Sequence, residues 1–120
     1  MNDILILYYS KNDSTKKMAR TIARGIESTG SISAKIRTVN SEHYSDTDDA
    51  IVTKDDLKDC VGMIIGSPTH FGNMAAPLKS FFDSTTEEWF NNTLENKLGG
   101  VFTSTSSLHG GQETTLISMM

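Results

Sequence analysis

Three short polar stretches hold most of the residue types in this chain that could bind a ligand. Residues 10–15 read SKNDST, residues 67–73 read SPTHFGN, and residues 104–112 read STSSLHGGQ. Each stretch follows an apolar run of strand length and is poor in acidic side chains. In an open parallel sheet, ligands bind outside the carboxyl ends of the strands. We therefore expect the three loops to form one binding site at that end of a sheet.

The first of these loops, residues 10–15, favours an anion such as phosphate. It offers three hydroxyl groups and a run of backbone N–H groups where a helix is expected to begin, and Lys16 and Lys17 follow directly. Exposed amides and the helix dipole both favour negative charge at such a position. The same residues also suit an ordinary helix N-cap, because Ser, Asp and Thr cap many helices.

Other classes of phosphate site fit the sequence poorly. The first loop is not G-x-x-x-x-G-K-[ST], and no G-x-G-x-x-G follows the first apolar run. A phospho-acceptor signalling domain of similar topology would need a carboxylate at the end of its third strand, where this chain has Ser67 and Pro68. The pattern therefore argues against a nucleotide-hydrolysing P-loop, a dinucleotide-binding domain and a phospho-acceptor domain.

The second loop, residues 67–73, suits the wall of a site for a planar ring. Pro68 fixes the backbone and Gly72 permits a close approach to it. Aromatic faces stack on rings and backbone amides can bind ring carbonyls, which gives Phe71 a role in such a site. A strand-to-helix turn with a buried phenylalanine explains the same residues. His70, taken alone, is more typical of a surface histidine than of a catalyst.

The remaining reactive residue types form no catalytic set that we recognise. The sequence contains no Ser-His-Asp arrangement, and His43, His70 and His109 lack the spacing of a metal site. Cys60 stands directly before an apolar run and is interpreted as a small buried hydrophobe. We therefore assign no catalytic side chain and no metal ligand.

Strands are expected at four places along the chain. Apolar runs at residues 4–9, 61–66 and 98–102 have strand length, and the first is typical of a strand covered on both faces. Residues 33–39 alternate between apolar and basic side chains, which is typical of an edge strand.

Helices are expected between these strands. Met18, Ile22 and Ile26 recur every four residues and predict a helix that ends near Gly30. Residues 53–56 have the spacing of a capping box and could start a short helix. Two more helices are expected, one carrying Leu78, Phe81 and Phe82 and one beginning around Gln112. The alternation predicts an α/β fold, an open parallel sheet with helices on both faces and right-handed crossovers.

Size and charge narrow the functional classes. A chain of 120 residues without repeats or linkers fits one domain, residues 1–120. Lys and Arg number 11 against 15 Asp and Glu, which argues against a nucleic-acid partner. The acidic residues between 40 and 60 are interpreted as a solvated loop. No apolar run approaches the roughly 20 residues of a membrane span, and the start lacks signal-peptide features. With its single cysteine, the chain is predicted to be cytoplasmic.

Four stretches together carry a family resemblance. They are residues 6–10 (ILYYS), 65–74 (IGSPTHFGNM), 81–83 (FFD), and 101–105 (VFTST) with 110–113 (GGQE). The second is long and specific. The chain resembles, from residue 4 to residue 115, the flavodoxin-like NAD(P)H:quinone oxidoreductases historically called tryptophan-repressor-binding proteins.

The resemblance implies FMN as cofactor, NAD(P)H as reductant and a quinone as substrate. It places the phosphate of FMN on residues 10–15 and the isoalloxazine on residues 68–73 and 104–111. It also places Trp89 where the family has an aromatic that covers the ring, often in a neighbouring subunit. The implied cofactor-binding residues are Ser10, Lys11, Asn12, Asp13, Ser14, Thr15, Pro68, Thr69, His70, Phe71, Gly72, Asn73, Ser104, Thr105, Ser106, Ser107, Leu108, His109, Gly110 and Gly111.

Two departures from the family have physical consequences. The family usually has Gly at Asp13; Asp tolerates left-handed backbone, but its carboxylate would repel a phosphate unless it points outward. The family continues with a fifth strand, a final helix and a histidine near the flavin, whereas this sequence ends at Met120. With only four strands, residues 98–102 form an apolar edge open to pairing. We therefore expect a homo-oligomer that pairs through this edge, unless the chain is a fragment.

Three functions stay open on the sequence alone. The first is two-electron reduction of quinones by NAD(P)H on FMN, in which the protein positions a cofactor that carries the chemistry. The second is an electron carrier of the flavodoxin type, whose acidic surface would dock on a basic partner. The third is a truncated domain without flavin, with a structural or interaction role.

Overall fold

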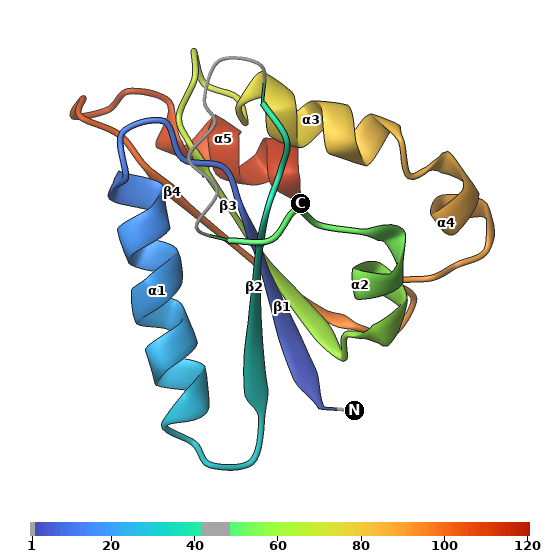
Figure 1. Ribbon diagram of the computed structural model, residues 1–120. Helices are drawn as coiled ribbons and strands as arrows, with labels where there is room; N and C mark the ends of the chain where they lie inside the picture. The colour runs from blue at the N-terminus through green and yellow to red at the C-terminus, as the bar shows by residue number, and fades with distance from the viewer. Residues whose placement is uncertain (1, 42–48) are drawn as a thin grey trace.

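The fold is an α/β sandwich around a four-stranded parallel sheet with strand order β2-β1-β3-β4 (Figure 1). The computed structural model describes residues 2–41 and 49–120. Its elements are β1 Asp3–Tyr8, α1 Ser14–Glu27, β2 Ser33–Thr38, α2 Lys54–Asp59, β3 Gly62–Pro68, α3 Ala76–Asp83, α4 Thr86–Phe90, β4 Leu98–Ser104 and α5 Gln112–Met119. The expected α/β class, the four strands and the edge position of residues 33–38 are confirmed. The short helix α4 was not predicted.

Strand β1 lies inside the sheet, and this position explains why its sequence is continuously apolar. It pairs with β2 on one side and with β3 on the other. Leu5, Ile6 and Leu7 are completely buried, since helices cover both faces of the sheet at this strand. Side chains alternate between the faces of a strand, so each face needs its own apolar residues.

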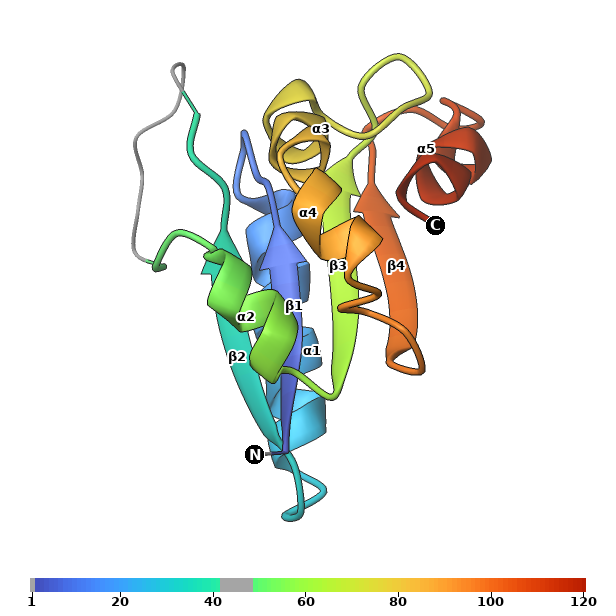
Figure 2. The ribbon, with the colours of Figure 1, turned by 90° about the vertical axis from the view of Figure 1, so that its right-hand side faces the viewer.

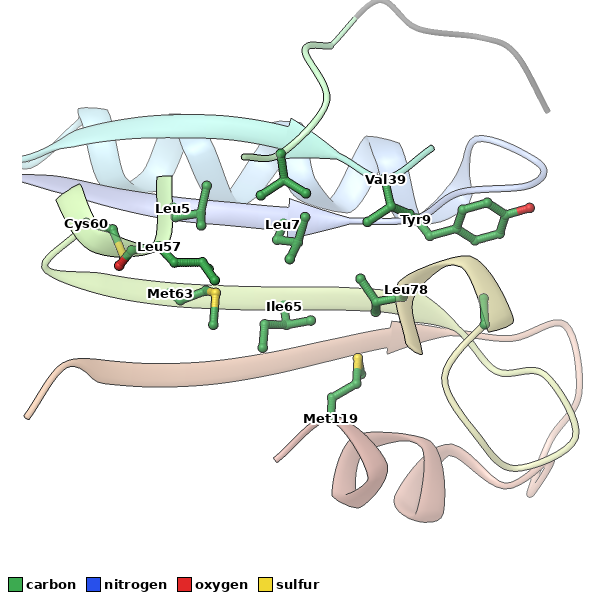
Figure 3. Close-up of a cluster of buried hydrophobic side chains, with 12 residues drawn as sticks. Leu5, Leu7, Tyr9, Val39, Leu57, Cys60, Met63, Ile65, Leu78 and Met119 are labelled. Carbon is green, nitrogen blue, oxygen red and sulfur yellow. The ribbon is translucent and has the colours of Figure 1, made fainter. Parts of the chain in front are cut away.

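The helices divide unequally between the two faces. Helix α1 covers one face and packs Ala19 against Ile6, Tyr8 and Phe102. Helices α2, α3, α4 and α5 lie on the other face, where Figure 2 shows α2 and α4 in front of the strands and α1 behind them. The larger apolar cluster is on this second face and is drawn in Figure 3, with Leu7, Leu57, Ile65, Leu78 and Met119 among its members.

Helix α2 begins with the predicted capping box. The Thr53 hydroxyl accepts a hydrogen bond from the Asp56 backbone N–H, and the Asp56 carboxylate accepts one from the Thr53 N–H at 2.9 Å. Lys97, just before β4, holds the other end of α2, because its ammonium donates to the carbonyls of Leu57 at 2.6 Å and Lys58 at 2.8 Å. Both ends of this short helix are therefore fixed by side chains.

The acidic segment is not simply a solvated loop, which corrects the sequence interpretation for two residues. The Asp49 carboxylate accepts hydrogen bonds from the Tyr8 hydroxyl at 2.5 Å and from Arg20 at 2.8 Å. Asp56 is buried and lies 3.3 Å from the Arg37 guanidinium. Burial, followed by the bond to Asp49, raises the pKa of Tyr8 far above its usual value. Residues 42–48, which include His43 and part of the predicted loop, lie outside the described residues.

Strand β4 is an edge of the described sheet. It pairs with β3 from Leu98 to Ser104 and has no strand on its other side within the part of the chain that the structure describes. Leu98 is 80% exposed there. The expectation of an apolar edge at residues 98–102 is thus met at Leu98. Across residues 2–41 and 49–120, no helix combines the length and the apolar character that crossing a membrane requires.

Candidate functional site

The loops that follow β1, β3 and β4 meet at the carboxyl end of the sheet, at the top of Figure 1. They enclose a pocket of about 340 Å³, called here the strand-end pocket. Its lining residues are Ser10, Lys11, Asn12, Ser14, Thr15, Pro68, Thr69, His70, Ser104, Thr105 and Ser106. Seven of these carry aliphatic hydroxyls, and none carries a carboxylate. The lining therefore suits an anion better than a cation.

The first wall of this pocket is the turn into α1. Asp13 takes the N-cap position in the left-handed conformation, with φ 67°, and makes no side-chain capping bond. An aspartate tolerates this conformation better than most residues do. Thr15 is almost fully buried, and its hydroxyl lies 3.0 Å from that of Ser104 in the third loop. This contact joins the first and third loops.

Ser10 contributes an unsatisfied buried hydroxyl to the same wall. Its side chain is 4% exposed, yet its Oγ atom has no hydrogen-bond partner. A buried polar atom without a partner costs free energy, so such atoms are rare outside sites that receive a ligand. Ser10 follows β1 directly and lines the pocket together with the start of α1.

The second wall is held in place from beneath by two hydroxyls. Ser67 is completely buried, and its Oγ accepts a bond from the Ala75 N–H at 2.8 Å. Thr103 donates to the Ser67 carbonyl at 2.7 Å, and its hydroxyl lies 2.9 Å from that of Thr69. Sequence reasoning missed the positioning roles of Ser67 and Thr103. The available signal was a hydroxyl residue near the carboxyl end of each of two otherwise apolar strands, β3 and β4.

The tip of the second loop is tight and exposes an aromatic ring. His70 and Asn73 exchange backbone hydrogen bonds at 2.9 and 3.1 Å across the turn. Phe71, between them, has φ 54° and is fully exposed. The alternative of a turn built around a buried phenylalanine is therefore wrong. A non-glycine residue in this backbone region is uncommon, and such conformations gather at functional sites.

The third loop packs against the second through glycine. Gly111 has φ 94°, and a Cβ atom placed there would lie 2.8 Å from the Gly72 Cα atom. Gln112 donates to the Ser107 carbonyl at 3.1 Å and so closes the loop over the start of α5. Only glycine permits this approach of the two backbones.

The pocket lining includes one lysine, Lys11, and one histidine, His70. Burial, followed by the nearby Lys11 charge, lowers the pKa of His70 below its ordinary value. The imidazole is therefore neutral near pH 7 and both donates and accepts hydrogen bonds. Its ring lies edge-on to Tyr9, with centroids 6.3 Å apart. Lys11 adds positive charge at the rim, where an anion would bind.

The structure brings eleven of the predicted cofactor-binding residues into the lining of one pocket. The other predicted residues lie in the same three loops but outside that lining: Asp13, Phe71, Gly72, Asn73, Ser107, Leu108, His109, Gly110 and Gly111. Trp89 lies on α4 and is 73% exposed; it lines other hollows instead. Its role and those of the loop residues stay predictions.

Two other sequence predictions concern metals and the cysteine. Within the described ranges, no group of three or more His, Cys, Asp or Glu residues could hold a metal ion. Cys60 is buried, as predicted, and its burial raises the pKa of the thiol. A thiol of this kind is a poor nucleophile at neutral pH.

Sequence comparisons connect this chain with flavin enzymes. The family described as NADPH-dependent FMN reductase matches residues 3–117. An NAD(P)H dehydrogenase (quinone) of Paracoccus denitrificans (strain Pd 1222) is 39% identical over 98% of this chain and 61% of its own length. NAD(P)H dehydrogenase (quinone) 3 of Rhizobium meliloti (strain 1021) is 40% identical over 98% of the chain and 60% of its own length. The chain thus spans about three fifths of these curated relatives.

Solved structures share the same fold. A flavodoxin described as WrbA-like from Agrobacterium tumefaciens superposes with a TM-score of 0.76 at 26% identity, over 97% of this chain and 67% of that one. A flavoprotein from Lactobacillus acidophilus NCFM in complex with FMN gives a TM-score of 0.62 at 23% identity, over 98% and 83% of the two chains. The flavodoxin-like fold predicted from the sequence is therefore confirmed.

Proposed function

We propose, because this chain belongs to the NADPH-dependent FMN reductase family, that it binds FMN and uses NAD(P)H to reduce quinones. The strand-end pocket is the binding site in this proposal. The observation that carries it is the Ser10 hydroxyl, which is buried in the pocket wall without a hydrogen-bond partner. A phosphate oxygen of FMN would satisfy that hydroxyl.

The start of α1 holds the phosphate in this proposal. Residues 10–15 supply the hydroxyls of Ser10, Ser14 and Thr15 and the backbone N–H groups at the start of α1. Lys11 lines the same pocket and contributes a positive charge. Asp13 does not line the pocket, so its carboxylate need not oppose the phosphate.

The second and third loops hold the isoalloxazine. Residues 68–70 and 104–106 line the pocket, and the backbone amides and hydroxyls of the two loops suit the ring's carbonyls and nitrogens. Phe71 offers an exposed face for stacking, and neutral His70 can donate or accept a hydrogen bond. The close packing of Gly72 against Gly111 keeps the two loops at a fixed spacing.

The reaction of this proposal transfers two electrons. Bound FMN supplies the redox chemistry, by which NAD(P)H and a proton convert a quinone to the quinol and leave NAD(P)⁺. The protein's own residues bind and orient the reactants, and no side chain of the described pocket needs to act as a general acid or base. Apart from Lys11 and Pro68, the pocket is lined by hydroxyl side chains, the Asn12 amide and one neutral imidazole.

The proposal extends to assembly and location. Trp89 covers the ring region of a neighbouring subunit, since it is 73% exposed and lies outside the pocket of its own chain. The edge strand β4, with Leu98 80% exposed, pairs with a second copy. Sedimentation velocity tests this, because Leu98→Lys should shift a dimer to monomers. We place the protein in the cytoplasm because it has one cysteine and no disulfide.

A fluorescence titration of FMN into the protein tests the binding site. We expect saturable quenching of flavin emission, with affinity about tenfold weaker in Ser10→Ala, since a hydrogen bond to a charged group is lost. Ser28→Ala is the matched control, because Ser28 is an exposed serine beyond the other end of α1. Absence of saturable quenching would remove the flavin proposal for this chain.

Turnover is tested separately by following NADH or NADPH oxidation with a quinone present. Oxidation that depends on both FMN and the quinone supports the reductase. FMN binding without such turnover would instead favour a single-electron carrier. The two measurements therefore distinguish binding from catalysis.

A further inference from the structure

A second pocket lies on the helix-rich face of the sheet, beside α4. Its volume is about 230 Å³, and its walls include Leu57, Phe82, Thr85, Glu88, Trp89 and Glu95. We call it the α4 pocket. Two of these walls are aromatic and two are acidic, and no basic residue lines it in the described part of the chain. Helices α2 and α4, which contribute Leu57, Glu88 and Trp89, lie side by side on one face of the sheet (Figure 2).

Glu88 has a buried carboxylate oxygen that lacks a hydrogen-bond partner. Its side chain is 9% exposed, and its Oε1 atom is fully buried with no hydrogen-bond partner. A buried charge that is not fully hydrogen-bonded is expensive, so a carboxylate in this position points to a missing donor.

Local helix capping does not explain Glu88. Thr85 and Glu88 have the T-x-x-E spacing of a capping box, yet Thr85 makes no side-chain cap to α4. Its hydroxyl donates instead to the Phe82 carbonyl at 2.6 Å. In α2 the same kind of spacing, from Thr53 to Asp56, does form the box. Thr85 and Glu88 therefore do not form the reciprocal box that fixes the start of α2.

Lys54 only partly compensates the carboxylate. Its ammonium lies 3.4 Å from Glu88 Oε1, without hydrogen-bond geometry, and donates at 2.8 Å to the Ser84 carbonyl. Lys54 is not among the residues that line the pocket. An ionised carboxylate accepts about four hydrogen bonds, so Glu88 keeps capacity for a donor that enters from the pocket.

We propose that the α4 pocket binds a guanidinium group on an aliphatic stem, either as a small free cation or as an arginine side chain. The planar guanidinium donates two parallel hydrogen bonds to a carboxylate and stacks on an indole, which matches Glu88 beside Trp89. Leu57 and Phe82 receive the stem, and Glu95 adds negative potential. The site shares no lining residue with the strand-end pocket of the same chain.

The first test uses the unmodified protein with butylguanidinium as the probe and butylurea as its neutral match. Trp89 is the only tryptophan of the chain and lines this pocket, so its emission reports on binding beside its indole. Calorimetry supplies the affinity. We expect saturable binding of butylguanidinium that is at least about tenfold tighter than that of butylurea, because butylurea carries no positive charge to pair with the Glu88 carboxylate. Equal binding of the two, or no binding of either, would overturn the proposal.

Three variants then locate the site. Glu88→Gln removes the charge and keeps the shape, and should weaken butylguanidinium binding about tenfold. Glu87→Gln is the matched control: the same charge change one residue earlier, outside the lining of the pocket. Lys54→Met removes the competing cation and should strengthen binding. Circular dichroism and thermal melting check folding. Unchanged affinity in a folded Glu88→Gln protein contradicts the site.

The affinity of a third ligand, N-acetyl-argininamide, distinguishes the two sources of the guanidinium group. Tighter binding of this blocked arginine than of butylguanidinium supports an arginine side chain of a protein partner. Tighter binding of butylguanidinium supports a small free cation. If neither compound shifts Trp89 emission or releases heat, the pocket does not recognise guanidinium.

Discussion

The strand-end pocket and the α4 pocket hold the two buried side-chain oxygens that lack a hydrogen-bond partner among the described residues, Ser10 Oγ and Glu88 Oε1. The first is a hydroxyl, which can donate to an anion. The second belongs to a carboxylate, which only accepts. The two pockets therefore have opposite preferences: the Ser10 hydroxyl suits an anion, and the Glu88 carboxylate suits a hydrogen-bond donor.

The two pockets also differ in what holds them in place. The strand-end pocket rests on the ends of paired strands, where Thr15, Thr69 and Ser104 are joined by hydrogen bonds across loops. The α4 pocket rests on a five-residue helix and on α2, which Lys54 and Lys97 attach to the rest of the domain. The comparison teaches that the sheet fixes the first site and side-chain contacts fix the second.

The largest expected effect is a loss of stability in a variant of β3, the strand that supports the second loop of the strand-end pocket. A Cβ atom at Gly66 would lie 2.1 to 2.5 Å from ring atoms of the buried Phe102. Gly66→Ala should therefore lower the free energy of unfolding by about 3 kcal/mol, because the ring cannot keep its place. Gly99→Ala is the matched control, since a Cβ there meets nothing within 4 Å. Equal urea midpoints for the two variants would contradict this account.

A second substitution should separate the pockets. Gly111→Ala forces a side chain into left-handed backbone and against Gly72, at a cost of about 1–3 kcal/mol. FMN titration should then give weaker binding, because the second and third loops move apart. Butylguanidinium titration should be unchanged, since the α4 pocket contains neither loop. Loss of both affinities would mean that the two sites are coupled.

A smaller effect compares the two unsatisfied oxygens in the protein without ligand. Glu88→Leu should raise the free energy of unfolding by about 1 kcal/mol, because a buried charge is replaced by an apolar group and Lys54 still reaches solvent. Ser10→Ala should change it by less than about 0.5 kcal/mol. Urea unfolding measures both. A clear loss of stability in Glu88→Leu would show that the Lys54 pair stabilises the fold.

The smallest expected effect is a pH dependence that belongs to the strand-end pocket alone. Burial lowers the pKa of His70 in the folded protein, so the unfolded chain takes up a proton first as the pH falls. Stability should therefore decrease as the pH drops below about 6.5, the ordinary histidine value, and level off below the folded pKa. His70→Gln should remove this part of the profile of melting temperature against pH, whereas exposed His109→Gln should keep it.

Local sequence signals predicted the parts of the fold that depend on neighbours along the chain. The apolar run before Tyr9, the four-residue spacing in α1 and the Thr53 capping box all appear where they were expected. Local signals failed where distant residues decide. Asp49 was expected in solvent, but Tyr8 and Arg20 bury its carboxylate. Such pairs form only after β1 and α1 have packed, so no window of sequence reveals them.

The binding site divides in the same way. The three loops could be placed in advance because parallel strands bring their carboxyl ends to one edge. The supporting contact of the Thr103 hydroxyl could not, since its acceptor, the Ser67 carbonyl, lies on the neighbouring strand and 36 residues away in sequence. The α4 pocket was missed because α4 was not predicted and because Leu57, Phe82 and Glu88 come from three different helices.

The central position of β1 has a consequence for hydrogen exchange. Its amides are paired on both sides, with β2 and β3, around three fully buried side chains. Amides of this kind exchange only when the whole domain opens, whereas those of an edge strand exchange through local fraying. Protection along β1 thus reports the global free energy of unfolding. Protection along β4 reports the local opening of the strand that supports the third loop. The difference between the opening free energies of β1 and β4 then measures how far the strand-end pocket opens without unfolding of the whole domain.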